Sequence, residues 1–213
     1  MVILFDFDGV LMDSMPIREV GFRKVLSGFP AHQIEKLINY HRENGGLSRY
    51  AKFEYFFNEI RKEEASSETI YKMADDFSKI MLDSLINPNL LIQDSLSFVK
   101  NNYERFPMHI VSGSDEKELK IICRRVNIYG YFVSIHGSPA PKDSLINKVI
   151  TNRDYNRNEI VFVGDSYNDL EAARKNYIHF TAFNNSDLRR EGIAYIDSFS
   201  QFNYLVEKWF SKE

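Results

Sequence analysis

The sequence feature that most constrains the fold is a set of short apolar runs, each followed by polar or glycine-containing residues. The first covers residues 2–7, Val-Ile-Leu-Phe-Asp-Phe, and it stops at the turn-forming pair Asp8-Gly9. Nearly continuous apolar runs of this length are typical of strands buried on both faces, as in parallel sheets. Similar runs occur at Met108–Val111, Phe132–Ile135, Ile160–Val163 and His179–Phe183. Helical patterns follow most of these runs, which predicts a doubly wound α/β domain with a parallel sheet.

The stretch from about Met15 to Ile86 is different, because it shows helical periodicity and no convincing strand. Apolar residues have helical spacing over residues 34–41, 50–60 and 70–81. Proline interrupts helices in the flanking segments Ser14–Pro16 and Asn87–Asn89. We therefore expect a helical insertion over residues 15–87 within a core domain made of residues 1–14 and 88–213. A closing helix that packs on the sheet is expected near the end of the chain, with Phe202, Leu205, Val206, Trp209 and Phe210 as its apolar residues.

The composition is that of an ordinary globular chain, with 44% hydrophobic and 27% charged residues and a formal net charge of −3. Such a chain has no overall positive field to attract nucleic acid or anionic lipid. No apolar run approaches the roughly 18 residues of a membrane helix, and the first residues lack the pattern of a signal peptide. The lone cysteine, Cys123, favours a reducing compartment. We expect a cytoplasmic protein that binds neither nucleic acid nor membrane.

Four polar segments draw attention because each adjoins an apolar run or opens a helical pattern. They are residues 6–14, 111–114, 141–143 and 163–169. In open α/β sheets the carboxyl ends of the strands form one site, so these segments should converge. The carboxylates of Asp6, Asp8, Asp165 and Asp169 would then repel one another unless a cation neutralised them. Oxygen ligands without a paired histidine or cysteine favour magnesium over zinc.

This set of groups suits phosphoryl chemistry. Magnesium together with a nearby lysine and hydroxyl can bind the oxygens of a phosphoryl group. A carboxylate that reaches the phosphorus can act as a covalent nucleophile and form an aspartyl phosphate. A second carboxyl two residues later can protonate the leaving oxygen and then activate water.

The chain resembles the haloacid dehalogenase superfamily in the order of its motifs, which are DxDGxxxDS, a serine, a lysine and GDxxxD. These motifs are spread over essentially the whole chain. The closest likeness is to its phosphoglycolate phosphatase-like branch. The resemblance implies a Rossmann-like core with an inserted α-helical cap domain. It also implies a magnesium-dependent phosphatase that hydrolyses a small phosphomonoester, either phosphoglycolate or a sugar phosphate, through an aspartyl phosphate. A cap of this kind restricts entry to small phosphorylated metabolites. We expect a monomer or weak dimer.

The resemblance implies a role for each matching residue. Asp6 would be the nucleophile, and Asp8 would be the general acid and base. Ser112, Gly113 and Lys142 would hold the oxygens of the transferred phosphoryl group. A buried acid such as Asp6 without a function would be costly, whereas Ser112 could also be read as a simple helix cap.

The metal would be bound by Asp6, by the backbone carbonyl of Asp8, and by Asp165. Asp169 would either bind the metal through water or orient Lys142. A simpler reading of Asp169 is a favourable partner for the N-terminal dipole of the next helix.

A sugar phosphomutase of the β-phosphoglucomutase type is the main alternative. The segment Gly46-Leu47-Ser48-Arg49 resembles the sugar-phosphate-contacting loop of those mutases, and an arginine can clasp a second phosphate or a carboxylate. Arg49 is therefore a candidate substrate contact, although Ser48-Arg49 also reads as an N-cap and a solvated first turn. The mutases carry a histidine five residues after the acid equivalent to Asp13, where this chain has Arg18. This departure favours hydrolysis. A binding module that had lost catalysis would lack one of the chemical residues, and none is missing.

Overall fold

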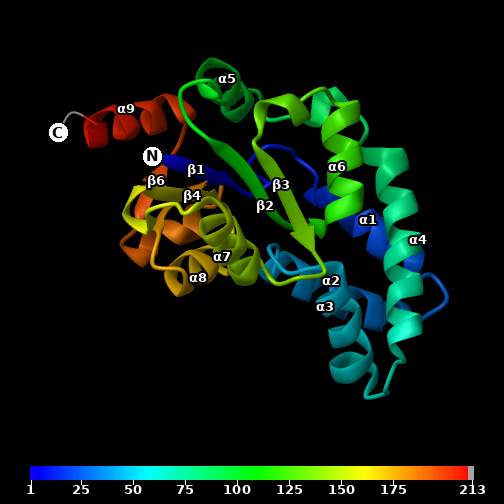
Figure 1. Cartoon of the computed structure of the whole chain (residues 1–213). Coiled ribbons are helices and arrows are strands. Elements are labelled where there is room, and N and C mark those ends of the chain that lie inside the picture. The colour runs from blue at the N-terminus through cyan, green and yellow to red at the C-terminus, as the bar shows by residue number, and fades with distance from the viewer. Residues whose placement is uncertain (211–213) are drawn as a thin grey trace.

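A parallel sheet with the strand order β3-β2-β1-β4-β5-β6 forms the centre of the protein (Figure 1). The computed structural model describes residues 1–210. The strands are β1 (Val2–Phe5), β2 (Met108–Asp115), β3 (Ser134–Ser138), β4 (Ile160–Gly164), β5 (His179–Phe183) and β6 (Ala194–Ile196). The chain winds from β1 to one edge of the sheet and then returns past β1 to the other. The predicted doubly wound α/β fold is therefore confirmed.

Helices cover both faces of the sheet. They are α5 (Gln93–Asn102), α6 (Glu116–Arg125), α7 (Lys142–Arg153), α8 (Tyr167–Lys175) and α9 (Phe199–Phe210). Successive side chains of a strand point to opposite faces, so Ile3 and Phe5 join the apolar core with α5, α6 and α9. Leu4 joins the core with α7 and α8. In the described part of the chain, no helix has both the length and the apolarity that a membrane crossing requires.

The strand boundaries differ from the sequence prediction at two places. The run Phe132–Ile135 was expected to be a strand, but β3 covers Ser134–Ser138, because Phe132 ends a 3₁₀ turn at Tyr129–Tyr131. The short edge strand β6 was not predicted, since only its last residue is buried. The predicted closing helix is present as α9, although the side chains of Trp209 and Phe210 lie outside the described part.

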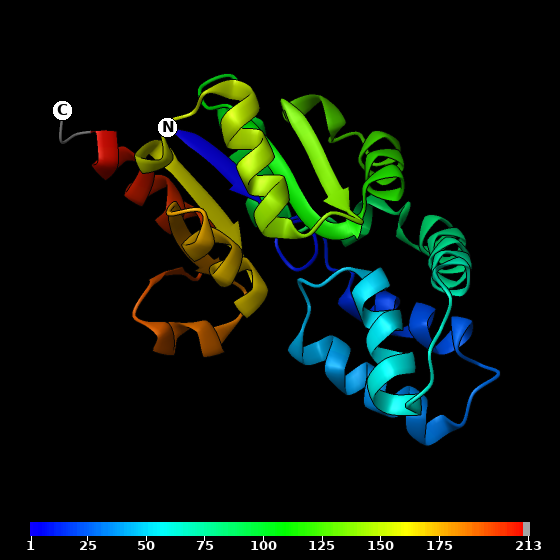
Figure 2. The same ribbon diagram turned by 60° about the horizontal axis from the view of Figure 1, so that its bottom comes forward.

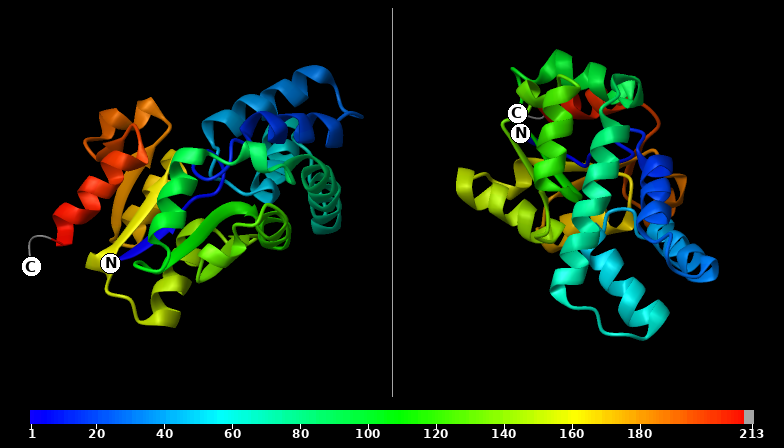
Figure 3. Two further views of the ribbon diagram at one scale, coloured as in Figure 1. Left: turned by 90° about the horizontal axis from the view of Figure 1, so that it is seen from above. Right: turned by 90° about the vertical axis from the view of Figure 1, so that its right-hand side faces the viewer.

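The segment between β1 and α5 is helical, as expected. It contains α1 (Met15–Val25), α2 (Ala31–Glu43), α3 (Arg49–Tyr55), a π-helical turn (Phe56–Arg61) and α4 (Ser67–Leu85). The buried rings of Phe22, Phe53 and Phe77 meet at its centre, with ring centroids 4.5–6.3 Å apart. We call these helices the cap. They lie across the carboxyl ends of the strands (Figure 2), while the start of β1 and the helix α9 lie at the far end of the molecule (Figure 3).

The two connections between cap and core run side by side. The N–H of Asp13 donates to the carbonyl of Leu90 at 2.8 Å, and the N–H of Ile92 donates to the carbonyl of Leu11 at 3.0 Å. An isolated antiparallel bridge joins Met12 to Leu91. The chain thus enters and leaves the cap at one place, through two connections that are hydrogen-bonded to each other.

Replacing Phe199 by alanine should destabilise the core domain strongly. The Phe199 ring is 2% exposed and lies 5.0 Å from the Phe183 ring and 6.1 Å from the Phe5 ring. Its removal would leave a cavity, and we expect the free energy of unfolding to fall by about 3–5 kcal/mol. Urea denaturation measures this change. Tyr204→Ala on the same helix is the control, since Tyr204 is 66% exposed, and an equal loss in both variants would contradict the packing described.

Candidate active site

Asp6 lies at the carboxyl end of the central strand β1. Its backbone N–H donates to the carbonyl of Val163 in β4 at 2.9 Å. Its carboxylate Oδ1 accepts a hydrogen bond from the N–H of Phe7 at 2.7 Å, and only 2% of the residue is exposed. The strand and this hydrogen bond hold the carboxylate in one orientation, as an attacking group requires.

Asp165 and Asp169 bring two more carboxylates to Asp6. Asp165 follows β4, and Asp169 lies in the first turn of α8. One carboxylate oxygen from each of the three residues lies within 4.8 Å of the others. Burial and then repulsion from Asp169 raise the pKa of Asp6 to about 7, and burial and then repulsion from Asp6 raise the pKa of Asp165 well above its usual value.

This group of oxygens fits a divalent cation. Its members are hard carboxylate donors, and no histidine or cysteine joins them in the part of the chain that the structure describes. Magnesium prefers such ligands, and its charge would offset the repulsion that raises the pKa of Asp6. Asp6, Asp165 and Asp169 are therefore the side chains that would hold it. The carboxylate of Asp8 lies outside this group, which leaves its backbone carbonyl as the predicted ligand.

Lys142 supplies positive charge to the same site. It is the first residue of α7 and is 8% exposed. Its Nζ lies 3.1 Å from Oδ1 of Asp6 and donates a hydrogen bond to Oδ1 of Asp169. Burial disfavours the ammonium form, but Asp169 and Asp6 outweigh it, so the pKa of Lys142 rises and the side chain stays charged. The two carboxylates also outweigh the unfavourable N-terminal dipole of α7.

Asp169 has two structural partners at once. Its Oδ2 accepts from the N–H of Ser166 at 3.1 Å and from the Ser166 hydroxyl at 2.7 Å, which forms a capping box at the start of α8. Its other oxygen accepts from Lys142. The Asp169 side chain therefore stabilises the start of α8 and contacts Lys142 at the same time, so the two interpretations of Asp169 do not exclude each other.

Asp8 faces a different set of partners. Its Oδ1 accepts from Nε of Arg18 at 2.7 Å and from the hydroxyl of Ser14, and its Oδ2 accepts from the hydroxyl of Ser114 at 2.6 Å. Burial alone would raise the pKa of Asp8, but the charge of Arg18 and these hydrogen bonds outweigh it and lower the pKa. The arrangement favours the carboxylate, which is the form that accepts a proton.

Ser112 and Gly113 lie near the end of β2, where the cap meets the core. Ser112 is fully buried, and its Oγ accepts from the N–H of Ser114 at 3.1 Å. A Cβ atom at Gly113 would lie 2.4 Å from the carbonyl oxygen of Gly46 in the cap. A Cβ atom at Gly46 would lie 2.6 Å from Oγ of Ser166. The cap loop therefore rests on the core at two glycines, with no room for a side chain at either.

Gly9 is required for another reason. Its φ is +77°, in the region that favours glycine, and a Cβ atom there would lie 1.9 Å from Oδ2 of Asp165. The turn after β1 can therefore approach the carboxylate of Asp165 only because residue 9 has no side chain.

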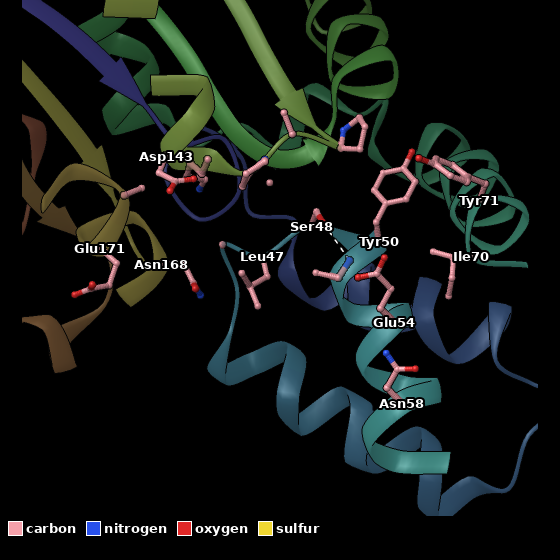
Figure 4. A pocket seen from close by; sticks show the side chains of 18 of the residues that line it. Leu47, Ser48, Tyr50, Glu54, Asn58, Ile70, Tyr71, Asp143, Asn168 and Glu171 are labelled. Atoms are coloured by element: carbon pink, nitrogen blue, oxygen red, sulfur yellow. Dashed lines mark hydrogen bonds between the residues drawn. The ribbon is translucent and has the colours of Figure 1, made fainter. Parts of the chain in front are cut away.

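A cavity of about 620 Å³ opens beside Lys142, between the cap and the core. The cap contributes Tyr50, Glu54 and Asn58 from the region of α3 and Tyr71 from α4 (Figure 4). The core side includes Asp143, Asn168 and Glu171. The wall is mixed in character, with hydrogen-bonding groups and aromatic rings. Such a wall suits a small polar molecule.

Arg49 does not line this cavity. It is 4% exposed, and its Nη1 lies 2.6 Å from Oε2 of Glu118 in the core and 2.6 Å from Oγ of Ser78. The predicted N-cap is present, since Oγ of Ser48 accepts from the N–H of Ala51, but Arg49 is not solvated. It lines a smaller hollow that also contains Asp8.

Three residues around Asp8 were missed by the sequence reasoning. Ser114 received no role in the segment 111–114, yet it lies in β2 and its hydroxyl donates to Asp8. Arg18 was noted only as the residue that replaces a histidine, yet it binds Asp8. Nothing in the sequence marks Glu118 as a site residue, because an acidic residue in a helix is usually exposed. In the structure Glu118 is only 2% exposed.

Known proteins are similar to this chain in sequence and in fold. Residues 3–183 match the family described as haloacid dehalogenase-like hydrolase. A phosphorylated carbohydrates phosphatase of Thermotoga maritima is 24% identical over 179 residues, which cover 81% of this chain and 79% of that protein.

Solved structures are similar over nearly the whole chain. A predicted phosphatase from Clostridium acetobutylicum has a TM-score of 0.78 at 16% identity, covering 97% of this chain and 98% of its own. A β-phosphoglucomutase from Clostridium difficile has a TM-score of 0.77 at 16% identity, covering 99% and 97%. These likenesses concern the fold. Since the family match covers most of the sequence, the chain belongs to the haloacid dehalogenase-like hydrolase family.

Proposed function

We propose that the protein is a magnesium-dependent phosphatase that hydrolyses a small phosphomonoester through an aspartyl phosphate on Asp6. The observation that carries the proposal is the position of Asp6, which is buried beneath the cap, 3.1 Å from Lys142 and within the carboxylate cluster. Bound magnesium would offset the charges of the phosphate and the carboxylates, so that the two can approach.

The first step is attack by the Asp6 carboxylate on phosphorus. The phosphorus–oxygen bond to the leaving group breaks, and the leaving oxygen takes a proton from Asp8. The ligand-free site favours the carboxylate of Asp8, so Asp8 must take up this proton before it can donate it. Lys142, Ser112 and Gly113 would hold the phosphoryl oxygens. In the second step Asp8, again a carboxylate, takes a proton from the water that attacks the aspartyl phosphate. Inorganic phosphate leaves, and Asp6 is regenerated.

The substrate we propose is a sugar phosphate or phosphoglycolate. The cavity of about 620 Å³ beside Lys142 gives room for a small leaving group, and the Thermotoga maritima relative is described as acting on phosphorylated carbohydrates. A cap over the site disfavours large substrates such as phosphoproteins. Action in the cytoplasm and a monomer or weak dimer remain predictions.

Replacing Asp6 by asparagine should reduce phosphate release at least about a thousandfold, because the amide keeps the shape but loses the attacking charge. Phosphate release from a panel of small phosphomonoesters measures the change. Asp13→Asn is the matched control, since Asp13 is exposed and has no place in the proposed chemistry. Near-normal turnover by Asp6→Asn would contradict the proposed nucleophile.

Activity should be lost after chelation and should return with magnesium but poorly with calcium. Below a pH of about 7 the metal-free Asp6 carries a proton, and a cation must displace it. Magnesium affinity should therefore be weaker at pH 6 than at pH 8, as titration calorimetry can measure. Full activity in chelator, or an affinity that does not change with pH, would argue against this metal site.

Hydrolysis and isomerisation can be separated with β-glucose 1-phosphate and a trace of the bisphosphate. A phosphatase either releases phosphate and glucose or leaves this compound unchanged. Fast formation of glucose 6-phosphate with little free phosphate would instead establish the mutase alternative. We expect no isomerisation, because Arg18 stands where the mutases place a histidine and is bound to Asp8.

A further inference from the structure

A small hollow of about 20 Å³ lies beside Asp8, at the boundary between cap and core. Arg18, His41, Arg49 and Lys52 contribute to its wall. Leu47 and Gly113 line both this hollow and the larger cavity. Because Asp8 is the proposed proton donor to the leaving oxygen, a group in this hollow would belong to the leaving group of the substrate.

The two guanidinium charges of the hollow are matched by carboxylates. Arg18 lies 2.7 Å from Asp8 and 3.4 Å from Oε1 of Glu118, and Arg49 lies 2.6 Å from Oε2 of Glu118. Glu118 is a core residue of α6 and is 2% exposed, so solvent does not screen these contacts. A second anionic group of a substrate would therefore add an unmatched charge to a buried site, which is costly.

Lys52 does not change this balance under alkaline conditions. Its Nζ contacts Nδ1 of His41 at 2.9 Å and the carbonyl oxygen of Gly45 at 3.1 Å. Burial, and then the charge of Arg18, lower the pKa of Lys52 to about 7. At pH 8 its amine is mostly neutral. In the ligand-free site, where Asp8 is ionised, Asp8 and Glu118 then balance the two guanidinium charges.

Three residues of the hollow carry a buried nitrogen that lacks a hydrogen-bond partner among the described residues: Nη2 of Arg18, Nη2 of Arg49 and Nε2 of His41. Within the same part of the chain, Oε2 of Glu118 also accepts no hydrogen bond, although it lies 2.6 Å from Nη1 of Arg49. Buried donors without acceptors are costly, so a site of this kind calls for an acceptor oxygen. A space of about 20 Å³ holds one water-sized group. The oxygen of a hydroxyl or carbonyl fits, and a phosphate group does not.

We infer that Glu118 is a specificity-determining residue that neutralises Arg49, so that the hollow accepts an uncharged oxygen of the leaving group. The inference rests on the proposed phosphatase function and narrows its substrate class. Preferred substrates carry one phosphate on a neutral, hydroxylated leaving group, as sugar and polyol monophosphates do. Esters with a carboxylate or a second phosphate on the leaving group are poor substrates.

The test compares matched esters at pH 8 with magnesium. Glycerol 1-phosphate is paired with 3-phosphoglycerate, and glucose 6-phosphate with glucose 1,6-bisphosphate, while p-nitrophenyl phosphate reports general phosphatase activity. For the wild-type protein we expect kcat/KM to favour the neutral member of each pair at least about tenfold, since like or unmatched charges are strongly disfavoured in a desolvated site.

The variant Glu118→Gln removes the counter-charge of Arg49 and keeps a similar shape. Its preference should move toward the anionic member of each pair by about tenfold, and the shift should appear mainly in KM. Glu116→Gln on the same helix is the matched control, because Glu116 is partly exposed and pairs with Lys120. It should leave the ratio unchanged. Circular dichroism and melting temperature verify the fold of both variants.

The outcomes separate this inference from the function on which it rests. The inference would be overturned if the protein hydrolyses p-nitrophenyl phosphate and also hydrolyses the anionic ester of each pair as fast as the neutral ester or faster. The phosphatase proposal would still stand. A folded Glu118→Gln variant with an unchanged ratio would also overturn the inference. If no ester is hydrolysed, the phosphatase proposal fails and the inference fails with it. The wild-type comparison decides the matter even where the variant does not fold.

Discussion

The mutual repulsion of closely spaced carboxylates at the end of β1 is the constraint on which the rest of the structure depends. Asp6, Asp165 and Asp169 are held together by three separate parts of the fold: β1, the turn after β4 and the start of α8. Lys142 from α7 partly compensates their charge. No local segment could hold such a cluster, which exists only where the ends of β1 and β4 meet the first turns of α7 and α8.

A second charged network connects Asp8 with the contacts between cap and core. Asp8 in the core binds Arg18 on α1, and Arg18 and Arg49 both contact Glu118 on α6. The hydroxyl of Tyr50 in the cap adds a hydrogen bond to Asp115 in the core at 2.9 Å. The surroundings of Asp8 therefore depend on the position of the cap. Opening the cap would remove Arg18 from Asp8 and so raise the pKa of Asp8. The proton transfer that we propose for Asp8 would therefore depend on the position of the cap.

Much of the fold could be predicted from sequence because its signals are local. The apolar run before Asp6 and the glycine after Asp8 mark a buried strand and its turn, and the helical spacing of the cap residues is strong. The edge strand β6 gives no such signal, because only one of its three residues is buried and no apolar pattern results. Glu118 could not be predicted for the opposite reason: its burial depends on two arginines that lie 100 and 69 positions earlier in the chain, as the residue numbers show. Contacts of that kind exist only in the folded molecule.

The close approach of Gly46 to Gly113 has a consequence for how tightly the cap can lie against the core. At this point the backbone of the cap lies against the backbone of the core. The two can come this close only because neither glycine has a side chain. A single methyl group at either position would act as a wedge. The cap would then lie farther from the core. Water would reach the ion pair of Arg49 in the cap with Glu118 in the core, which is shielded from solvent while the two parts are in contact, and this ion pair would weaken.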